Sequence, residues 1–367
     1  MKEIRSILKA YKDLPEGRRV ALATVVRVEG SSYRRTGARM LIMDDGNWIG
    51  GISGGCLEGD ALRKAQLAIL REQPSLVTYD TTDDDAQQIG VGLGCNGIID
   101  VLIAPLEQDS PLNPLHILEG CLGERQPSIL LTISHYEGAG PLYPGQMIKY
   151  ENGGLAGKLP EGFPIKQLLA DIEQVQARQK SSSNTYPWKR EEVGVFIEFL
   201  PPELRLLLFG GNYDVFPMAQ LARAIGHEVT VYANPHKLSR AIFKEAHVVK
   251  EKEAEVEVDD YTACILMAHD YKTDLANLQR LLPTDVPYIG LLGPRKRTDK
   301  MLDELAAAGF ALNGESQARL HSPVGLDIGA LSPEEIALSV LAEIRAFFSQ
   351  RSGGFLKHRR GTIHERA

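Results

Sequence analysis

Residues 204–214 read Leu-Arg-Leu-Leu-Leu-Phe-Gly-Gly-Asn-Tyr-Asp, an apolar run that stops at a pair of glycines. This pattern predicts a buried strand, a tight turn and then a helix. The same alternation of strand and helix recurs farther along the chain, with apolar runs at 228–232, 247–250, 262–267 and 288–292 between segments of helical periodicity. Strands that alternate with helices form a parallel sheet covered on both faces. We therefore expect a doubly wound, Rossmann-like domain over residues 201–349.

The first turn of this domain lies where dinucleotide-binding proteins hold a pyrophosphate. Gly210 fits the first glycine of that fingerprint, but Asn212 stands at the position of the second. At the end of the second strand, Ala233 stands where an acidic residue would hold the ribose. These departures leave nucleotide binding by this domain in doubt. An NAD(P)-dependent oxidoreductase is the alternative hypothesis for the function.

Two later loops at the carboxyl edge of the predicted sheet are rich in polar residues. His269 follows the strand at 262–267, and Gly293, Arg295 and Arg297 follow the strand at 288–292. Sheets of this class bind ligands at that edge, and a loop with two arginines that opens a helix is a candidate anion clamp. The alternatives are a histidine satisfied within the core and two arginines on a helix surface.

Residues 1–200 are expected to form a separate mixed α+β domain. Apolar, β-branched runs predict strands at 20–28, 39–43, 77–79, 98–103, 128–134 and 195–200, with a helix at 57–72. Residues 174–192 include Lys-Ser-Ser-Ser-Asn and are predicted to form an exposed or mobile loop. Pro201-Pro202 marks the boundary to the second domain, and residues 350–367 form a basic C-terminal tail.

Two glycine-rich loops of the first domain each carry one cysteine. Residues 50–58 read Gly-Gly-Ile-Ser-Gly-Gly-Cys-Leu-Glu, and residues 90–97 read Gly-Val-Gly-Leu-Gly-Cys-Asn-Gly. Glycines let backbone N–H groups face a ligand, and a helix N-terminus favours a thiolate. Cys56 is therefore predicted to be a reactive thiol or a soft metal ligand beside an anion site. The alternative is a small buried residue behind a tight turn.

A third loop, at residues 29–37, reads Glu-Gly-Ser-Ser-Tyr-Arg-Arg-Thr-Gly. Its hydroxyl groups and two guanidinium groups suit an oxyanion such as phosphate, although two arginines on a turn are often only solvated. This loop and the loop at 50–58 bracket one predicted hairpin, so we expect them to share a site. The three aspartates at 83–85 are interpreted as a solvated turn or helix start, with cation binding as the less favoured alternative.

Composition excludes several classes of function. The chain has 367 residues and a formal charge of −7, which argues against general nucleic-acid binding. Its 4 cysteines include no close C-x-x-C pair, which excludes a disulfide framework and a zinc module. No signal peptide or apolar run long enough for a transmembrane helix is found in the sequence. We expect a cytoplasmic protein.

The motifs together resemble the xanthine dehydrogenase accessory (XdhC/CoxI-type) family. Residues 30–40 and 52–58 are similar to the two N-terminal signatures of that family, and residues 79–85 and 92–97 are similar to two more. In the second domain, residues 289–297 and 323–330 resemble the Rossmann-type half of the family, as does the tail at 361–364. Relatives commonly carry a glycine and an acid where this chain has Asn212 and Ala233.

The resemblance implies a maturation factor without turnover of its own. Such a protein binds the molybdopterin-type molybdenum cofactor, protects it while a cysteine desulfurase adds the sulfido ligand, and inserts it into a xanthine dehydrogenase-like molybdenum hydroxylase. A homodimer is expected, and Cys56 and Cys95 are candidate molybdenum ligands. The candidate cofactor-binding residues are Ser31, Ser32, Arg34, Arg35, Arg39, Ser53, Gly54, Gly55, Cys56, Glu58, Gly94, Cys95, Asn96, Gly210, Asp214, His269, Gly293 and Arg295.

Overall fold

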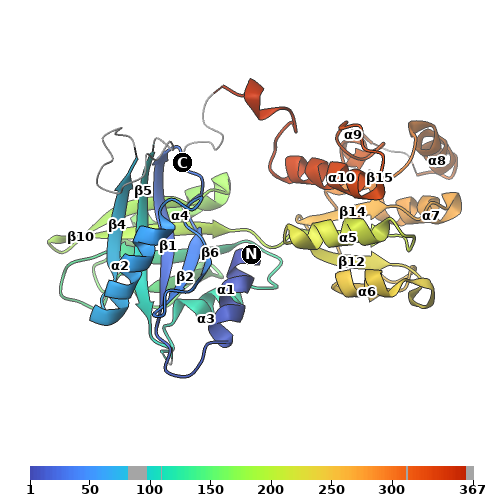
Figure 1. The fold of residues 1–367 in the computed structure, drawn as a ribbon. Helices are drawn as coiled ribbons and strands as arrows, with labels where there is room; N and C mark the ends of the chain where they lie inside the picture. Colours follow the sequence, from blue (N-terminus) through green and yellow to red (C-terminus); the bar gives the residue numbers. More distant parts are fainter. Residues whose placement is uncertain (82–96, 109, 311–312, 361–367) are drawn as a thin grey trace. The chain divides into compact units, whose positions relative to one another are not determined.

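The computed structural model describes residues 1–81, 97–108, 110–310 and 313–360. The chain divides into two compact units, Met1–Pro202 and Glu203–His358, directly after Pro201-Pro202 (Figure 1). No helix in the described part of the chain is both long and apolar enough to cross a bilayer.

The second unit is a doubly wound parallel sheet, as the sequence predicts. Its strand order is β13-β12-β11-β14-β15-β16, and every neighbouring pair is parallel. The strands are β11 (Arg205–Phe209), β12 (Glu228–Tyr232), β13 (Val248–Lys250), β14 (Thr262–Leu266), β15 (Tyr288–Leu291) and β16 (Leu320–His321). The chain reverses its direction of winding beside β11, so the loops after β11 and β14 flank the expected ligand-binding crevice.

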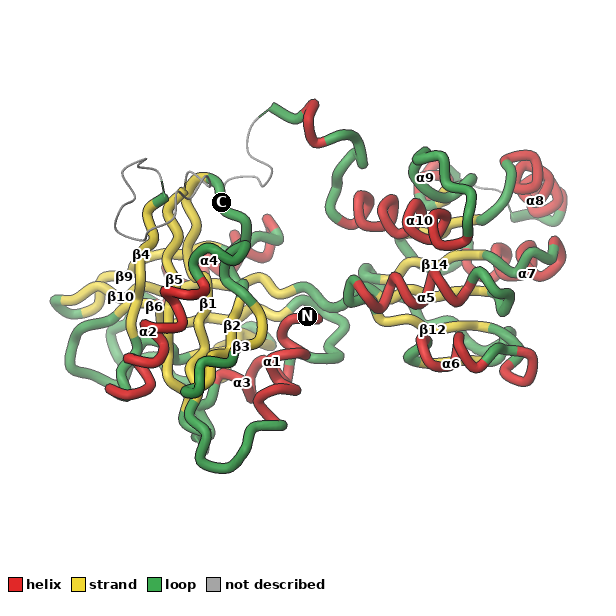
Figure 2. Tube along the Cα trace, viewed as in Figure 1, coloured by secondary structure: helices red, strands yellow, loops and turns green. Residues whose placement is uncertain are grey.

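Helices cover both faces of this sheet (Figure 2). One face packs on α5 (Val215–Ala224), α6 (Arg240–Glu245) and α10 (Pro333–Phe348), and the other packs on α7 (Tyr271–Leu281) and α8 (Arg295–Ala307). Three short helices complete the described part of the unit: η1 (Pro235–Lys237), α9 (Gly314–Ala318) and η2 (Leu356–His358). Burial of both sheet faces explains why the strands read as continuous apolar runs.

The first unit contains two five-stranded antiparallel sheets (Figure 2). The first sheet has the order β3 (Trp48–Gly50), β2 (Arg39–Met43), β1 (Val20–Gly30), β5 (Gly97–Leu106) and β4 (Ser75–Asp80). The second has the order β8 (Gly154–Ala156), β7 (Met147–Glu151), β6 (Ser128–His135), β10 (Glu191–Leu200) and β9 (Ser182–Trp188). Helices α1 (Lys2–Lys12) and α3 (Pro114–Gly120) pack beside them.

These two sheets form the middle of a four-layer sandwich. Helix α2 (Glu58–Arg71) covers the outer face of the first sheet, and α4 (Ile165–Arg178) covers that of the second. The helix predicted at 57–72 is confirmed, and its apolar residues Leu57, Ala61, Ala65, Ala68 and Ile69 are all buried. The inner faces of the sheets meet through apolar side chains such as Val26, Leu102 and Phe196.

The first unit is an internal repeat. Its strand orders become identical when five is added to each strand number of the first sheet, and each repeat places a helix between its third and fourth strands. The two helices each have 14 residues and end at a residue in the left-handed region, Glu72 at φ 55° and Gln179 at φ 50°. We call residues 20–106 the first repeat and residues 128–200 the second repeat.

The prediction of a loop at 174–192 is wrong. These residues finish α4, form β9 and begin β10, and β9 pairs with β10 from Ser182↔Ile197 to Trp188↔Glu191. Tyr186 and Trp188 are buried on one face of β9, and this alternation holds the strand in place. The Ser183 hydroxyl donates a hydrogen bond to the Val26 carbonyl of the first sheet, so one of the serines that suggested a loop ties the two sheets together.

Candidate functional site

Two of the predicted loops lie at one end of the first sheet. The loop between β1 and β2 ends at Arg39, which pairs with Thr24, and β3 ends at Gly50, which pairs with Met40. The connection from β4 to β5 leaves from the same end, since Asp80 pairs with Ile98. The sheet register therefore brings together segments that are far apart in the sequence, as the shared-site hypothesis requires.

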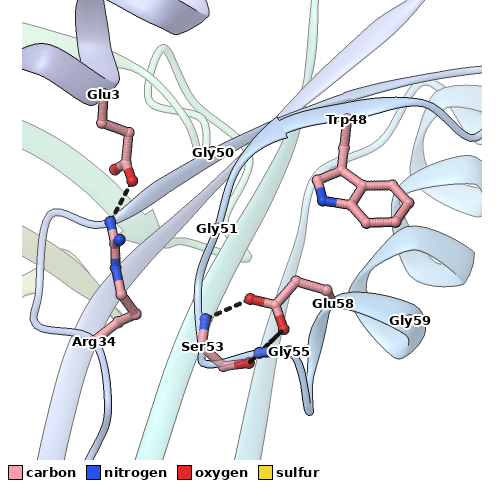
Figure 3. Close-up of a pocket in the computed structure, with 9 residues that line it drawn as sticks. All are labelled: Glu3, Arg34, Trp48, Gly50, Gly51, Ser53, Gly55, Glu58 and Gly59. Atoms are coloured by element: carbon pink, nitrogen blue, oxygen red, sulfur yellow. Dashed lines mark hydrogen bonds and ion pairs between the residues drawn. The ribbon is translucent and has the colours of Figure 1, made fainter. Parts of the chain in front are cut away.

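An open pocket of about 550 Å³ lies between these loops (Figure 3). Arg34 comes from the β1–β2 loop, Trp48 from β3, and Glu3 from α1. The remaining lining residues come from the end of β3, the glycine loop and the start of α2: Gly50, Gly51, Ser53, Gly55, Glu58 and Gly59. Four of the predicted site residues thus line this pocket, namely Arg34, Ser53, Gly55 and Glu58.

The Glu58 carboxylate fills the anion site of the glycine loop. Its Oε1 accepts hydrogen bonds from the backbone N–H groups of Ile52 (3.2 Å) and Ser53 (2.7 Å), and its Oε2 accepts from Gly55 N–H (3.0 Å) and the Ser53 hydroxyl. Burial alone would raise the pKa of Glu58, but these hydrogen bonds lower it below the usual value. The N–H groups that we expected to face an external anion are therefore occupied by the chain's own carboxylate.

This network fixes the loop that carries Cys56. The Ser53 hydroxyl also accepts hydrogen bonds from the N–H groups of Gly55 (3.2 Å) and Leu57 (3.0 Å), so the turn is bound at both ends. Cys56 lies at the exposed part of the turn, as a free thiol two residues before α2. The alternative of a small buried cysteine is wrong. Glu58 positions the thiol and does not present free oxygens to a ligand.

Arg34 is held at the pocket by the N-terminal helix. Its guanidinium group forms an ion pair with Glu3, whose other oxygen accepts a hydrogen bond from the Arg39 N–H at 2.9 Å. The Tyr33 ring packs over Gly54, where an added Cβ would lie 3.2 Å from the ring. Gly54 is therefore needed for aromatic packing between the two loops.

The expectation that Arg39 binds a cofactor is corrected by its burial. Its side chain is 1% exposed and forms a bidentate ion pair with Glu198 of β10, with one N–O distance of 3.0 Å. Burial alone would lower the pKa of Arg39, but the Glu198 charge raises it. Gly37 leaves room for this pair, because a Cβ there would lie 2.5 Å from a Glu198 oxygen. Arg39 thus links the two sheets and does not reach the surface.

The other predicted residues of the first domain lie outside the lining of this pocket. Ser31 and Arg35 are exposed, and Ser32 is half-buried with a hydroxyl that has no hydrogen-bond partner among the described residues. Gly94, Cys95 and Asn96 lie outside the described residues, as do the aspartates at 83–85 and the tail motif at 361–364. The role of Cys56 and Cys95 as molybdenum ligands stays a prediction.

At the carboxyl edge of the second unit, Asp214 and His269 form a close pair. His269 Nε2 lies 2.6 Å from Asp214 Oδ2, while Asp214 Oδ1 is buried without a partner among the described residues. The His269 side chain is 53% exposed, so the core alternative for this residue is wrong. Its φ of 59° lies in the left-handed region. The crevice therefore carries a carboxylate–imidazole pair that the sequence alone did not join.

One of the two arginines of the predicted anion clamp after β15 is engaged within the fold. Arg297 forms an ion pair with Asp274 at 2.7 Å, and the same carboxylate accepts a hydrogen bond from Ala268 N–H. Burial raises the pKa of Asp274. Arg295 is exposed at the start of α8, and Gly293 is exposed at φ 124°. Asp274 was missed at the sequence level because its partner comes from another helix.

The glycines of the first turn serve packing within the second unit. A Cβ at Gly210 would lie 2.5 Å from the Met267 carbonyl oxygen, so β11 and β14 can approach only if this residue is glycine. A Cβ at Gly211 would lie 3.1 Å from Leu238 and 3.2 Å from Ala233, which is itself buried. The end of β12 therefore presents a methyl group where a ribose-binding acid would stand.

Comparison with known proteins gives consistent matches along the chain. The XdhC and CoxI family model matches residues 14–80, and the XdhC Rossmann domain model matches residues 206–344. A probable xanthine dehydrogenase subunit from Bacillus subtilis is 31% identical over 90% of this chain and 94% of its own. The molybdenum cofactor insertion chaperone PaoD of Escherichia coli is 26% identical over 93% of this chain and 87% of its own.

A solved structure extends this likeness to the fold. The crystal structure of a xanthine dehydrogenase from Bacillus halodurans superposes with a TM-score of 0.75, at 28% identity, over 96% of this chain and 97% of its own.

Proposed function

Because this chain belongs to the XdhC and CoxI family, we propose that it is an accessory protein that binds the molybdopterin-type molybdenum cofactor. It assists sulfuration of the cofactor, with a cysteine desulfurase as the sulfur donor, and inserts the cofactor into a xanthine dehydrogenase-like molybdenum hydroxylase. It acts as a cytoplasmic homodimer without turnover of its own. The relative named a cofactor insertion chaperone supports this role, since the similarity covers most of both chains.

The observation that carries the proposal is the pocket lined by Arg34 and Gly55, with Cys56 next to Gly55 in the chain. Arg34 offers a guanidinium group to the phosphate of the cofactor, which would replace Glu3 as its partner. Cys56 is exposed on a turn that Ser53 and Glu58 hold in shape. A thiolate is a soft ligand that suits a molybdenum centre. The pocket is open to solvent at one side, as a site that must give up its cargo requires.

Retention of the cofactor tests the proposal. Purified protein is mixed with free molybdopterin, passed over a gel-filtration column and assayed for bound pterin. We expect the wild-type chain to retain cofactor and Arg34→Gln to retain about tenfold less, since a charge-assisted hydrogen bond contributes about 1.5–3 kcal/mol. Cys56→Ala should lose the metal-containing form and keep metal-free molybdopterin.

Arg178→Gln is the matched control, because Arg178 is an exposed arginine at the end of α4 in the second repeat. The control should retain as much cofactor as the wild type. If the wild-type chain retained no cofactor, or if Arg34→Gln and Arg178→Gln behaved alike, the proposed role of this pocket would be wrong.

A further inference from the structure

Trp48 is an exposed tryptophan on the wall of the pocket. Its side chain is 46% exposed, although it belongs to β3, at the edge of the first sheet. A single exposed aromatic residue needs no special explanation. Trp48 differs because its neighbours in the pocket lining include Gly50, Gly51 and Gly59, which have no side chains to cover the indole.

One of these glycines is required by the fold. A Cβ at Gly50 would lie 2.3 Å from the Arg39 carbonyl oxygen, and Gly50 has a φ of 87°. A Cβ at Gly51 would lie 3.4 Å from the Glu58 carboxylate, which is an ordinary van der Waals contact. Gly50 alone is thus explained by packing and backbone conformation.

Gly59 has no such explanation. It is the second residue of α2, and a Cβ placed on it would have no heavy atom within 4 Å. Glycine is among the poorest helix formers, so a residue with a side chain would suit this position better for stability alone. The effect of Gly59 is to leave open space in the pocket that Trp48 also lines.

A cation lies across the pocket from this space. Figure 3 shows Arg34 and Trp48 on opposite sides of the segment Gly50–Gly51, with the Glu58 carboxylate turned toward the loop. Arg34 is the one guanidinium group among the described residues of the lining, and its partner Glu3 comes from a different element. The two sides of the pocket therefore differ in chemistry: one offers an aromatic face and empty space, and the other offers a positive charge.

We propose that Trp48 and Gly59 form a slot for the flat heteroaromatic ring of the ligand, while Arg34 binds the anionic group that the same ligand carries. The proposal rests on the proposed function and assigns the pterin ring of the cofactor to Trp48. A ring stacked on an indole gains dispersion and electrostatic contacts. The pocket volume of about 550 Å³ suits a ligand of this size.

Binding of three probes to four variants tests the slot. The probes are molybdopterin, a phosphate-free pterin and inorganic phosphate, and dissociation constants are measured by calorimetry. Trp48→Phe should keep most of the affinity for both pterins, whereas Trp48→Leu should weaken both by about tenfold or more. Gly59→Leu should weaken both to a similar extent while it leaves the melting temperature unchanged or raises it.

Gly120→Leu is the matched control, because Gly120 also lies in a helix with no heavy atom within 4 Å of an added Cβ. It should bind all three probes like the wild type. Fluorescence adds a direct readout, since the chain has 2 tryptophans and Trp188 is buried in the second repeat. The free pterin should quench the emission in the wild type, and this quenching should be lost in Trp48→Phe.

The outcomes separate the two proposals. If the wild type binds molybdopterin while Trp48→Leu and Gly59→Leu bind it equally well, the slot is wrong and the proposed function stands. If the wild type binds the free pterin but not molybdopterin, the slot stands and the proposed function is wrong. If phosphate alone competes fully with molybdopterin and the free pterin does not bind, the ring has no site at Trp48 and the slot is wrong.

Discussion

The two repeats of the first unit have the same topology but different connections. In the first repeat, residues 51–57 join β3 to α2 through a glycine turn that exposes Cys56. In the second repeat, residues 157–164 join β8 to α4, and Phe163 of this connection is buried in the core while the Glu161 carbonyl accepts a hydrogen bond from Trp188. The repeated architecture builds the sandwich, whereas the candidate site is formed by the first repeat together with Glu3 of α1.

The connections between the last two strands of each repeat also differ, and again the first repeat has the glycine-rich one. In the second repeat β9 and β10 are joined by Lys189-Arg190, whereas in the first repeat the chain between Asp80 and Gly97 includes the second glycine–cysteine motif. A short hairpin leaves no room for a ligand-binding segment. A duplicated fold can thus keep its core while the loops of its two copies diverge.

The largest effect is expected where the repeats meet, at the buried pair of Arg39 and Glu198. Glu198→Ala should lower the free energy of unfolding by about 3–5 kcal/mol, because it leaves a buried guanidinium group without its partner. Urea unfolding measures this loss. Glu119→Ala, which removes an exposed ion-pair partner of Lys12, is the control and should cost under about 1 kcal/mol. Equal costs for the two variants would mean that the repeats are not joined by this pair.

As the pH is lowered, the doubly wound unit should lose folding stability before the first unit does. Burial, with a smaller contribution from Arg345, lowers the pKa of His227 from 6.5 to about 4. The unfolded state then binds more protons between these two values, so stability falls as the pH falls from about 6.5 to 4, by about 3 kcal/mol in total. Melting followed from pH 7 to pH 4 should show this loss, and His227→Leu should flatten it. Earlier opening of the first unit in acid would contradict this expectation.

The conformation of the glycine loop should depend on the Glu58 side chain. The matching connection of the second repeat should not depend on the Glu161 side chain. Glu58→Ala should cost about 2 kcal/mol, because the backbone N–H groups of Ile52, Ser53 and Gly55 lose their acceptor. Hydrogen exchange of residues 52–57 should become faster. Glu161→Ala is the matched control: its side chain is exposed, only its backbone carbonyl is used, and the cost should be under about 0.5 kcal/mol. Similar exchange at 157–164 in both variants would confirm that the effect is local.

The smallest effect is a pH-dependent loosening of the same loop. The pKa of Glu58 is lowered in the folded chain, so its hydrogen bonds contribute stability above the unfolded value and lose it as the pH falls through the lower, folded value. The amide proton shifts of Ser53 and Gly55 should titrate together below pH 4.5. The amides of the second repeat's connection should not follow them. A titration at or above that pH would show that burial outweighs the hydrogen bonds.

The sequence predicted the fold well where the pattern is local. The predicted strand at 228–232 coincides with β12, and that at 39–43 coincides with β2, because apolar and β-branched runs report burial directly. Strand β9 was missed because the serines at 181–183 are typical of loops and the two buried aromatic residues that fix its register come after them. The internal repeat was missed since it lies in the order of strands and not in shared motifs.

The site was predicted in part for a similar reason. Glycine-rich loops indicate free N–H groups, but they do not tell whether a ligand or a side chain of the protein accepts from them. Glu58 lies only five residues after Ser53, and this spacing was the one signal available for their hydrogen bond. Burial of Arg39 depends on Glu198, which is more distant in the sequence than any pattern can relate.

The Glu58 carboxylate that occupies the glycine loop also affects the residence time of a ligand in the pocket. An anion that met bare N–H groups there would be anchored by a strong local field and would leave slowly. Because Glu58 already neutralises that field, residence depends on the few remaining contacts of an open pocket. Under the proposed function, Glu58 would therefore shorten the residence time of the ligand in this pocket and favour its transfer to a protein that binds it more tightly.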